Sequence, residues 1–298
     1  MTHVAFVIGD PGRAALELPD GPPPARIGPA DVECSAASMP GLLVRAATCR
    51  GLMHRANGTP RQDAFALGQA DDNAGLIAVV CDGVGQFGRS DEAALFTSRR
   101  LAALGAEGLP WPDAFVRVNQ ELDKIAGEAR ATDTADADAN GMATTAVAIS
   151  VRRKEDGWAG EAAWVGDSTV WRLDADSRWT LITGSIEGDD GDDGYHSTGV
   201  RPLPSSNGKC MSLEFTVGPG ALFVMTDGVA NPLKWSSDVQ DALAGWWMLA
   251  PDPFTFAAQV GFARKSHMDD RTVVGIWPGP GDADEGRESE ARAANLPG

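Results

Sequence analysis

The apolar run Ile77–Cys81 leads directly into Asp82 and Gly83, and this stretch constrains the fold more than any other part of the chain. A short run of apolar residues predicts a buried strand. Asp82 must then lie at the rim of the sheet, because burying an unpaired carboxylate costs free energy. Gly83 allows the backbone to turn tightly and to approach another group closely. The stretch therefore predicts a strand that presents a carboxylate at its end.

The same region also matches a dinucleotide-binding fingerprint, since Gly83-Val84-Gly85-Gln86-Phe87-Gly88 has the form GxGxxG. That motif needs a second strand about 20 residues further on, whereas the pattern here predicts a helix and then the loop 105–110. Asp82 would also repel a pyrophosphate bound at the first glycine. A nucleotide-dependent oxidoreductase remains a competing hypothesis, and a titration with NAD or NADP would test it. The other interpretation is that Asp82 holds a metal ion, assisted by the next carbonyl.

The pattern of an apolar strand ending in Asp recurs. It occurs in Val79–Gly83, Ala163–Ser168 and Phe223–Gly228, and the pair Asp269-Asp270 precedes the last predicted strand. A single Asp-Gly is ordinary turn chemistry, but a sheet brings several strand ends together. Carboxylates that converge repel one another unless a cation lies among them. Ligands that offer only oxygen favour magnesium or manganese over zinc.

Two such ions hold a phosphate and activate water between them, so the pattern predicts phosphoester hydrolysis without a protein nucleophile. Nucleophile motifs are missing, because the chain has neither GxSxG nor GxxxxGK[ST]. Its four histidines (His3, His54, His196 and His267) show no triad pattern, and its four cysteines show no zinc spacing.

The formal net charge of −17 argues against nucleic acid and anionic membrane surfaces as partners. No stretch approaches 18 uninterrupted apolar residues, and the N-terminus lacks the features of a secretory signal. We therefore expect a cytoplasmic protein that binds neither nucleic acid nor membrane.

Three regions are expected: an N-terminal extension, partly ordered, over 1–40; a catalytic domain over 41–278; and an acidic disordered tail over 279–298. Strands are predicted at 42–50, 62–67 and 77–81, antiparallel to one another because their links are short. Residues 54–61 are expected to form a turn. Helices are predicted at 90–104, 112–130, 236–249 and 252–267. The predicted strands come in groups with short links, and pairs of helices separate these groups. This order favours an α+β fold with antiparallel sheets and with the helices outside them.

Six short motifs, in this order, resemble those of the metal-dependent type 2C serine/threonine protein phosphatases, bacterial branch. They are Gln62-Asp63-Ala64, Asp82-Gly83-Val84-Gly85, Gly141-Met142-Ala143-Thr144-Thr145, Val165-Gly166-Asp167-Ser168, Thr226-Asp227-Gly228 and Asp269-Asp270-Arg271-Thr272. The resemblance spans about residues 42–277. It implies a four-layer α-β-β-α sandwich, two antiparallel sheets flanked by helix pairs, with two Mn²⁺ or Mg²⁺ ions between the sheets.

The resemblance also implies roles for individual residues. Asp82 is similar to the carboxylate that bridges both ions, and the carbonyl of Gly83 to a ligand of the second ion. Asp227 and Asp269 resemble the remaining ligands of the first ion, with Asp270 as an alternative to Asp269. Asp63 resembles the acid that holds a water ligand. Asp167 resembles a residue with a structural or indirect role.

Three positions differ from residues found in the family, and the phosphate-binding arginine is not settled. Gln62 stands where the family usually has a glutamate ligand of the second ion, so it offers an oxygen without charge. Asn140 stands at the place of an acid for a third ion, with Asp138 nearby, and Val84 replaces the general-acid histidine of eukaryotic members. For the phosphate-binding arginine, Arg55 and Arg61 are both candidates.

The expected function is hydrolysis of phosphoserine and phosphothreonine on proteins, among them targets of a Ser/Thr kinase, by a monomeric enzyme. The alternative is a pseudophosphatase, a binding module of this fold with an impaired second metal site. Residues 184–208 lie where the family has a variable flap, and the sequence does not identify the substrate.

Overall fold

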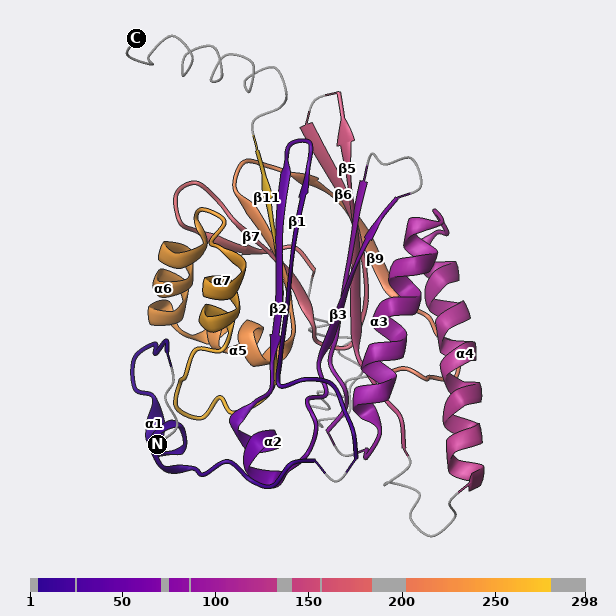
Figure 1. Cartoon of the computed structure of the whole chain (residues 1–298). Coiled ribbons are helices and arrows are strands. Elements are labelled where there is room, and N and C mark those ends of the chain that lie inside the picture. Colours follow the sequence, from indigo (N-terminus) through magenta and orange to yellow (C-terminus); the bar gives the residue numbers. More distant parts are fainter. Residues whose placement is uncertain are drawn as a thin grey trace, which may run out of the picture.

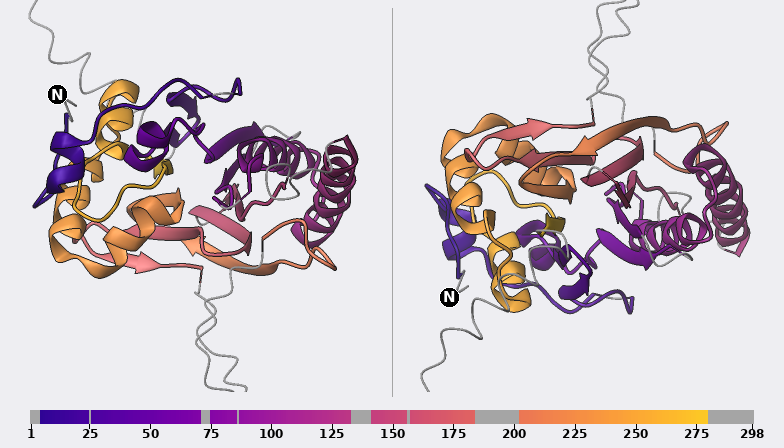
Figure 2. Two further views of the ribbon diagram at one scale, coloured as in Figure 1. Left: turned by 90° about the horizontal axis from the view of Figure 1, so that it is seen from below. Right: turned by 90° about the horizontal axis from the view of Figure 1, so that it is seen from above.

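A computed structural model describes residues 5–24, 26–70, 75–85, 87–132, 141–155, 157–183 and 202–279. Its strands form two antiparallel sheets that lie face to face, with helices on both outer faces (Figures 1 and 2). Asp138, Asn140 and most of the expected flap at 184–208 lie outside the described residues.

The first sheet has six strands in the order β1-β2-β11-β10-β7-β8. Their bounds are β1 (Val32–Met39), β2 (Leu42–Cys49), β11 (Arg271–Pro278), β10 (Ala221–Met225), β7 (Thr169–Leu173) and β8 (Trp179–Leu181). The second sheet has five strands in the order β3-β4-β5-β6-β9. Their bounds are β3 (Ala64–Gln69), β4 (Gly75–Cys81), β5 (Ala146–Lys154), β6 (Gly157–Val165) and β9 (Met211–Val217).

Two long helices, α3 (Ser90–Ala106) and α4 (Trp111–Thr132), cover the outer face of the second sheet. Three shorter helices cover the first sheet: α5 (Asp227–Trp235), α6 (Ser237–Trp247) and α7 (Pro253–Val260). Two further short helices, α1 (Gly12–Glu17) and α2 (Leu52–Asn57), lie near the lower end of the molecule in Figure 1.

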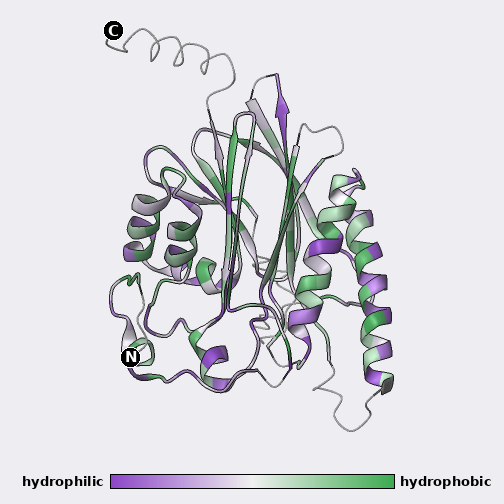
Figure 3. Cartoon of the chain, viewed as in Figure 1, coloured by the Kyte–Doolittle hydropathy of each residue, from purple (hydrophilic) through white to green (hydrophobic). Residues whose placement is uncertain are grey.

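Strand β4 shows why the fold has four layers. Its alternate residues Ile77, Val79 and Cys81 pack under α3 and α4, whereas Leu76, Ala78 and Val80 pack between the two sheets. Because both faces are covered, every residue of the strand is buried and the run is continuously apolar. In contrast, the helices α3 and α4 carry hydrophilic as well as hydrophobic stretches, as expected for an outer layer (Figure 3).

Three sequence-based expectations about local structure are wrong. Strands β3 and β4 are antiparallel neighbours, but β2 belongs to the other sheet. Residues expected to form a turn include the helix α2, which ends at Gly58 in the left-handed conformation with φ 66°. Helix α5 was not expected, and it begins at Asp227 itself.

The dinucleotide-binding alternative does not agree with this topology. Strand β4 pairs antiparallel with both β3 and β5, whereas the fingerprint requires parallel strands joined by a crossover helix.

The N-terminal region is built into the fold. Strand β1 pairs with β2 along its whole length, and Ile8 is buried against the first sheet's helices. The expected boundary after residue 40 stays a prediction, as does the tail from residue 279. Among the helices that the structure describes, none combines the length and apolar character needed to cross a membrane.

Candidate active site

Carboxylates from both sheets meet at one end of the sandwich. Asp82 follows β4, Asp227 follows β10, and Asp269 lies just before β11. Burial raises the pKa of Asp82 well above its usual value, and the charges of Asp63, Asp227, Asp269 and Asp167 raise it further. Five carboxylates, each next to a strand, therefore share one electrostatic environment.

Asp227 shows how unfavourable this environment is for negative charge. The pKa of Asp227 is raised to about 7, mainly by burial and further by the charges of Asp167 and Asp269. Hydrogen bonds with Asp82 and with the Gly228 backbone oppose it only in part. A divalent cation among these groups would remove the repulsion and keep the carboxylates ionised.

Asp63 is fixed by two threonines of the opposite sheet. Its Oδ2 accepts hydrogen bonds from Thr226 Oγ1 and Thr272 Oγ1, both at 2.8 Å. Burial, together with the charges of Asp270 and Asp269, raises the pKa of Asp63, and the two threonines lower it. Asp63 thus joins the sheets at the end where the carboxylates lie.

The Thr144-Thr145 pair holds the backbone of Asp82. The Asp82 carbonyl accepts hydrogen bonds from Thr145 N at 2.8 Å and from Thr144 Oγ1 at 2.9 Å. Thr145 Oγ1 also lies 3.1 Å from Ser168 Oγ, which connects this motif to the turn that carries Asp167. The described part of the 141–145 motif therefore positions the strand ends and supplies no carboxylate.

Gln62 presents a buried side-chain oxygen without a partner among the described residues, and Gly83 packs closely against the backbone of Gln62 and Ser90. The buried Gln62 Oε1 has no hydrogen-bond partner among the described residues, and a Cβ added at Gly85 would lie 3.5 Å from it. A Cβ added at Gly83 would lie 2.7 Å from Ser90 O and 2.8 Å from Gln62 O. An unpaired buried oxygen requires an explanation, and a cation ligand is one that agrees with the surrounding acids.

The structure distinguishes Asp269 from Asp270. Asp270 is buried, and its carboxylate accepts hydrogen bonds from Gly51 N at 2.6 Å, His54 Nδ1 at 2.8 Å and Gln62 N at 2.5 Å. Asp269 is exposed, and its Oδ1 accepts one hydrogen bond, from Asp270 N at 2.8 Å. Asp270 is therefore used in holding the 51–62 segment in place, which leaves Asp269 as the better candidate ligand.

His54, Asp269 and Asp270 are the described residues whose potential ligand atoms all lie within 4.8 Å of one another. The carboxylates of Asp82, Asp227 and Asp269 are less tightly gathered than this trio. Burial lowers the pKa of His54, but its hydrogen bond with Asp270 and the charges of Asp270 and Asp269 raise it overall. We interpret His54 as part of the support around Asp270, because that carboxylate already accepts three hydrogen bonds.

The two neighbouring acids give a matched test. We expect Asp270→Ala to lower the free energy of unfolding by about 3 kcal/mol, because the buried donors of Gly51 and Gln62 lose their acceptor. Asp269→Ala should leave stability nearly unchanged in EDTA but weaken Mn²⁺ binding. Urea denaturation and Mn²⁺ titration measure the two effects. Equal destabilisation by both variants would contradict this distinction.

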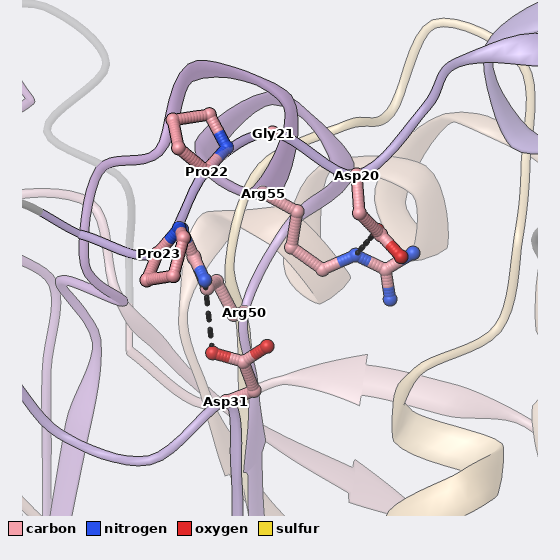
Figure 4. A pocket seen from close by; sticks show the side chains of 7 residues that line it. All are labelled: Asp20, Gly21, Pro22, Pro23, Asp31, Arg50 and Arg55. Atoms are coloured by element: carbon pink, nitrogen blue, oxygen red, sulfur yellow. Dashed lines mark hydrogen bonds and ion pairs between the residues drawn. The ribbon is translucent and has the colours of Figure 1, made fainter.

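The two candidate phosphate-binding arginines are both engaged elsewhere. Arg55, a residue of α2, lines a pocket in which its Nε is 3.2 Å from Asp20 Oδ1 (Figure 4). Arg61 is buried, and its Nη1 donates to Thr48 Oγ1 and to the Asp63 carbonyl at 2.8 and 2.7 Å. The structure therefore does not bring Arg55 to the carboxylates, and Arg61 acts as a support for Asp63.

Sequence reasoning missed several residues of this site. Thr226 precedes Asp227 and Thr272 lies two residues after Asp270, so their place in the motifs was the available signal. The link from Asp270 to Gly51 spans 219 residues, and no local pattern indicates it.

Solved structures of bacterial phosphatases have this fold. Serine/threonine phosphatase Stp1 from Staphylococcus aureus matches with a TM-score of 0.56 at 17% identity, over 80% of this chain and 95% of that chain. PppA from Pseudomonas aeruginosa matches with a TM-score of 0.56 at 18% identity, over 82% and 99%. The serine/threonine phosphatase of S. agalactiae gives 0.55 at 15% identity, over 83% and 99%. None of the curated proteins matches in sequence.

The fold is that of these bacterial phosphatases, and the carboxylates form a site that can hold metal ions. A model of the family Protein phosphatase 2C matches residues 50–259, which is more than half of the chain. The chain belongs to the protein phosphatase 2C family. It is therefore a metal-dependent protein serine/threonine phosphatase, and its substrates are phosphoproteins.

Proposed function

We propose that this protein hydrolyses phosphoserine and phosphothreonine at a centre of two divalent cations held by Asp82, the carbonyl of Gly83, Asp227, Asp269 and Gln62. The observation that carries the proposal is the convergence of carboxylates from both sheets, with the pKa of Asp82 raised well above its usual range. The family match supports a metal-dependent phosphatase and gives no support to the pseudophosphatase alternative.

The donors in this set are oxygens, which favour Mg²⁺ or Mn²⁺. When bound, the pair of ions supplies electrostatic stabilisation of the phosphate and a water acidic enough to attack it near neutral pH.

The protein's own residues supply the geometry. The charges of four other carboxylates act on Asp82, so it is the residue that two ions could share. Asp63 is held rigidly by Thr226 and Thr272, so it can accept a hydrogen bond from the attacking water and orient it. That Arg55 contacts the phosphate stays a proposal. To do so, Arg55 must give up its ion pair with Asp20 and bind the substrate instead.

We further propose that the substrates include targets of a Ser/Thr kinase, that the enzyme acts as a monomer, and that it works in the cytoplasm. The test of substrate class is phosphate release from matched peptides that carry phosphothreonine, phosphoserine or phosphotyrosine, with Mn²⁺ present. We expect turnover of the first two. Preference for the phosphotyrosine peptide would contradict the proposed substrate class.

Gln62 leads to a prediction about the second ion. Because carboxylate charge increases the affinity of an oxygen site for a divalent cation, we expect Gln62→Glu to lower the Mn²⁺ concentration for half-maximal activity about tenfold. Gln69→Glu, exposed at the other end of β3, is the control and should behave as wild type. Unchanged or weaker Mn²⁺ dependence in Gln62→Glu would argue against Gln62 as a ligand.

A further inference from the structure

The Arg271 side chain connects two segments: the first turn of α5, which carries Asp227, and the residues before β11, which include Asp269. Its Nε donates to the Gly228 carbonyl at 3.1 Å, and its Nη2 donates to the His267 carbonyl at 2.7 Å. Gly228 directly follows Asp227, and His267 lies two residues before Asp269. A single side chain therefore contacts the backbone on both sides of the candidate ligand pair.

This guanidinium is deeply buried. Arg271 is 5% exposed and lies over the ring of Phe262, 4.6 Å from its centroid. Burial lowers the pKa of Arg271 to about 10. Burying a charged side chain costs free energy that burying an apolar side chain of similar size does not. Hydrogen bonds that only the charged group can make offset this cost. The bonds to the two carbonyls are the interactions that distinguish Arg271 from such a side chain.

The two segments are in direct contact, so small displacements matter. A Cβ added at Gly228 would lie 1.9 Å from the Asp270 carbonyl oxygen. Where the two segments leave the sheet, Thr226 N donates to Thr272 O at 3.1 Å. The Arg271 side chain links the two segments beyond this last hydrogen bond between the ends of β10 and β11.

A force acts against this connection. Asp227 and Asp269 are both acids, and like charges repel each other. Without a link between the two segments that carry them, that repulsion would move the carboxylates apart whenever no cation lies between them. A metal site, however, needs its ligands held within about 0.5 Å of the binding geometry.

We propose that Arg271 is a positioning residue that fixes the separation of Asp227 and Asp269 and thereby sets the affinity of the divalent cation they share. This inference rests on the proposed metal centre. Arg271 acts through the backbone of the two segments that carry Asp227 and Asp269. It contacts neither the substrate nor the reacting atoms.

The test is calorimetric titration of the full chain with Mn²⁺, comparing wild type, Arg271→Met and Arg271→Lys. We expect the dissociation constant of the Met variant to rise at least about tenfold. Lysine keeps the charge but lacks the planar fork that reaches both carbonyls, so the Lys variant should fall between the two. At saturating Mn²⁺, kcat of the variants should approach the wild-type value, because the ligands themselves are unchanged.

Arg264→Met is the matched control. Arg264 also links separate segments, donating to the Ile8 carbonyl at 3.2 Å and to Ser236 Oγ at 2.9 Å. Its loss should lower stability without changing Mn²⁺ affinity, which separates general destabilisation from positioning of the ligands.

The outcomes separate the two proposals. If wild type does not bind Mn²⁺, the proposed metal centre is wrong. If wild type binds Mn²⁺ and Arg271→Met binds it equally well, the role of Arg271 alone is wrong. Circular dichroism shows whether each variant folds. If Arg271→Met does not fold, the Arg271→Lys variant decides. An unchanged Mn²⁺ affinity in Arg271→Lys then overturns the inference, and a weakened Mn²⁺ affinity supports it.

Discussion

Asp82→Asn is expected to reduce Mn²⁺-dependent phosphatase activity at least about a thousandfold, which corresponds to about 4 kcal/mol of transition-state stabilisation. Asp82 interacts with the charges of Asp63, Asp167, Asp227 and Asp269, so it is the carboxylate best placed to serve both ions. Asparagine keeps the size and one oxygen of the side chain but removes the charge. Initial rates with para-nitrophenyl phosphate measure the effect.

The control for this variant is Asp241→Asn, which removes a carboxylate from the exposed surface of α6. It should retain wild-type activity. The Asp82→Asn protein should remain folded in EDTA and gain stability there, because a source of repulsion is removed. Activity within tenfold of wild type in a folded Asp82→Asn protein would contradict the central role of Asp82.

The second large effect is the dependence of folding stability on pH. In the folded protein the pKa of Asp227 is about 7, against an ordinary value of 3.8. Between these values the folded state binds more protons than the unfolded state, so the free energy of unfolding falls as pH rises. The penalty is absent below about pH 4 and complete above about pH 7. A shift of this size corresponds to a few kcal/mol, or roughly 5–10 °C in melting temperature.

Thermal unfolding at pH 5 and pH 8, in EDTA and in saturating Mn²⁺, measures this prediction. In EDTA the melting temperature should be lower at pH 8. In Mn²⁺ the order should reverse, because protons compete with the cation at low pH and binding stabilises the folded state. Asp227→Asn should weaken the pH dependence seen in EDTA. The same profile with and without Mn²⁺ would mean that these carboxylates do not bind the ion.

Much of the fold is predictable because its strands are marked by burial. The run before Asp82 is continuously apolar because both faces of β4 are covered. The sheet membership of β2 is not predictable in the same way. A short connection favours an antiparallel neighbour, but here the connection contains α2 and crosses to the other sheet.

Within the site, local motifs locate the acids but not their partners. Asp82, Asp227 and Asp269 each adjoin an apolar strand, so their convergence follows from the sheets. The difference between Asp269 and Asp270 depends on donors from Gly51 and Gln62, which are distant in sequence. The sequence leaves Arg55 and Arg61 both open as the phosphate-binding arginine, and it does not predict the ion pair of Arg55 with Asp20, which lies in a segment without periodic sequence signals.

The most direct test of the account is hydrolysis of para-nitrophenyl phosphate by the wild-type protein in Mn²⁺, in Mg²⁺ and in EDTA. We expect turnover with Mn²⁺ or Mg²⁺ and its loss in EDTA, with recovery when the ion is restored. Turnover that persists undiminished in EDTA, or a folded protein that shows none with either ion, would contradict a metal-dependent phosphatase at these carboxylates.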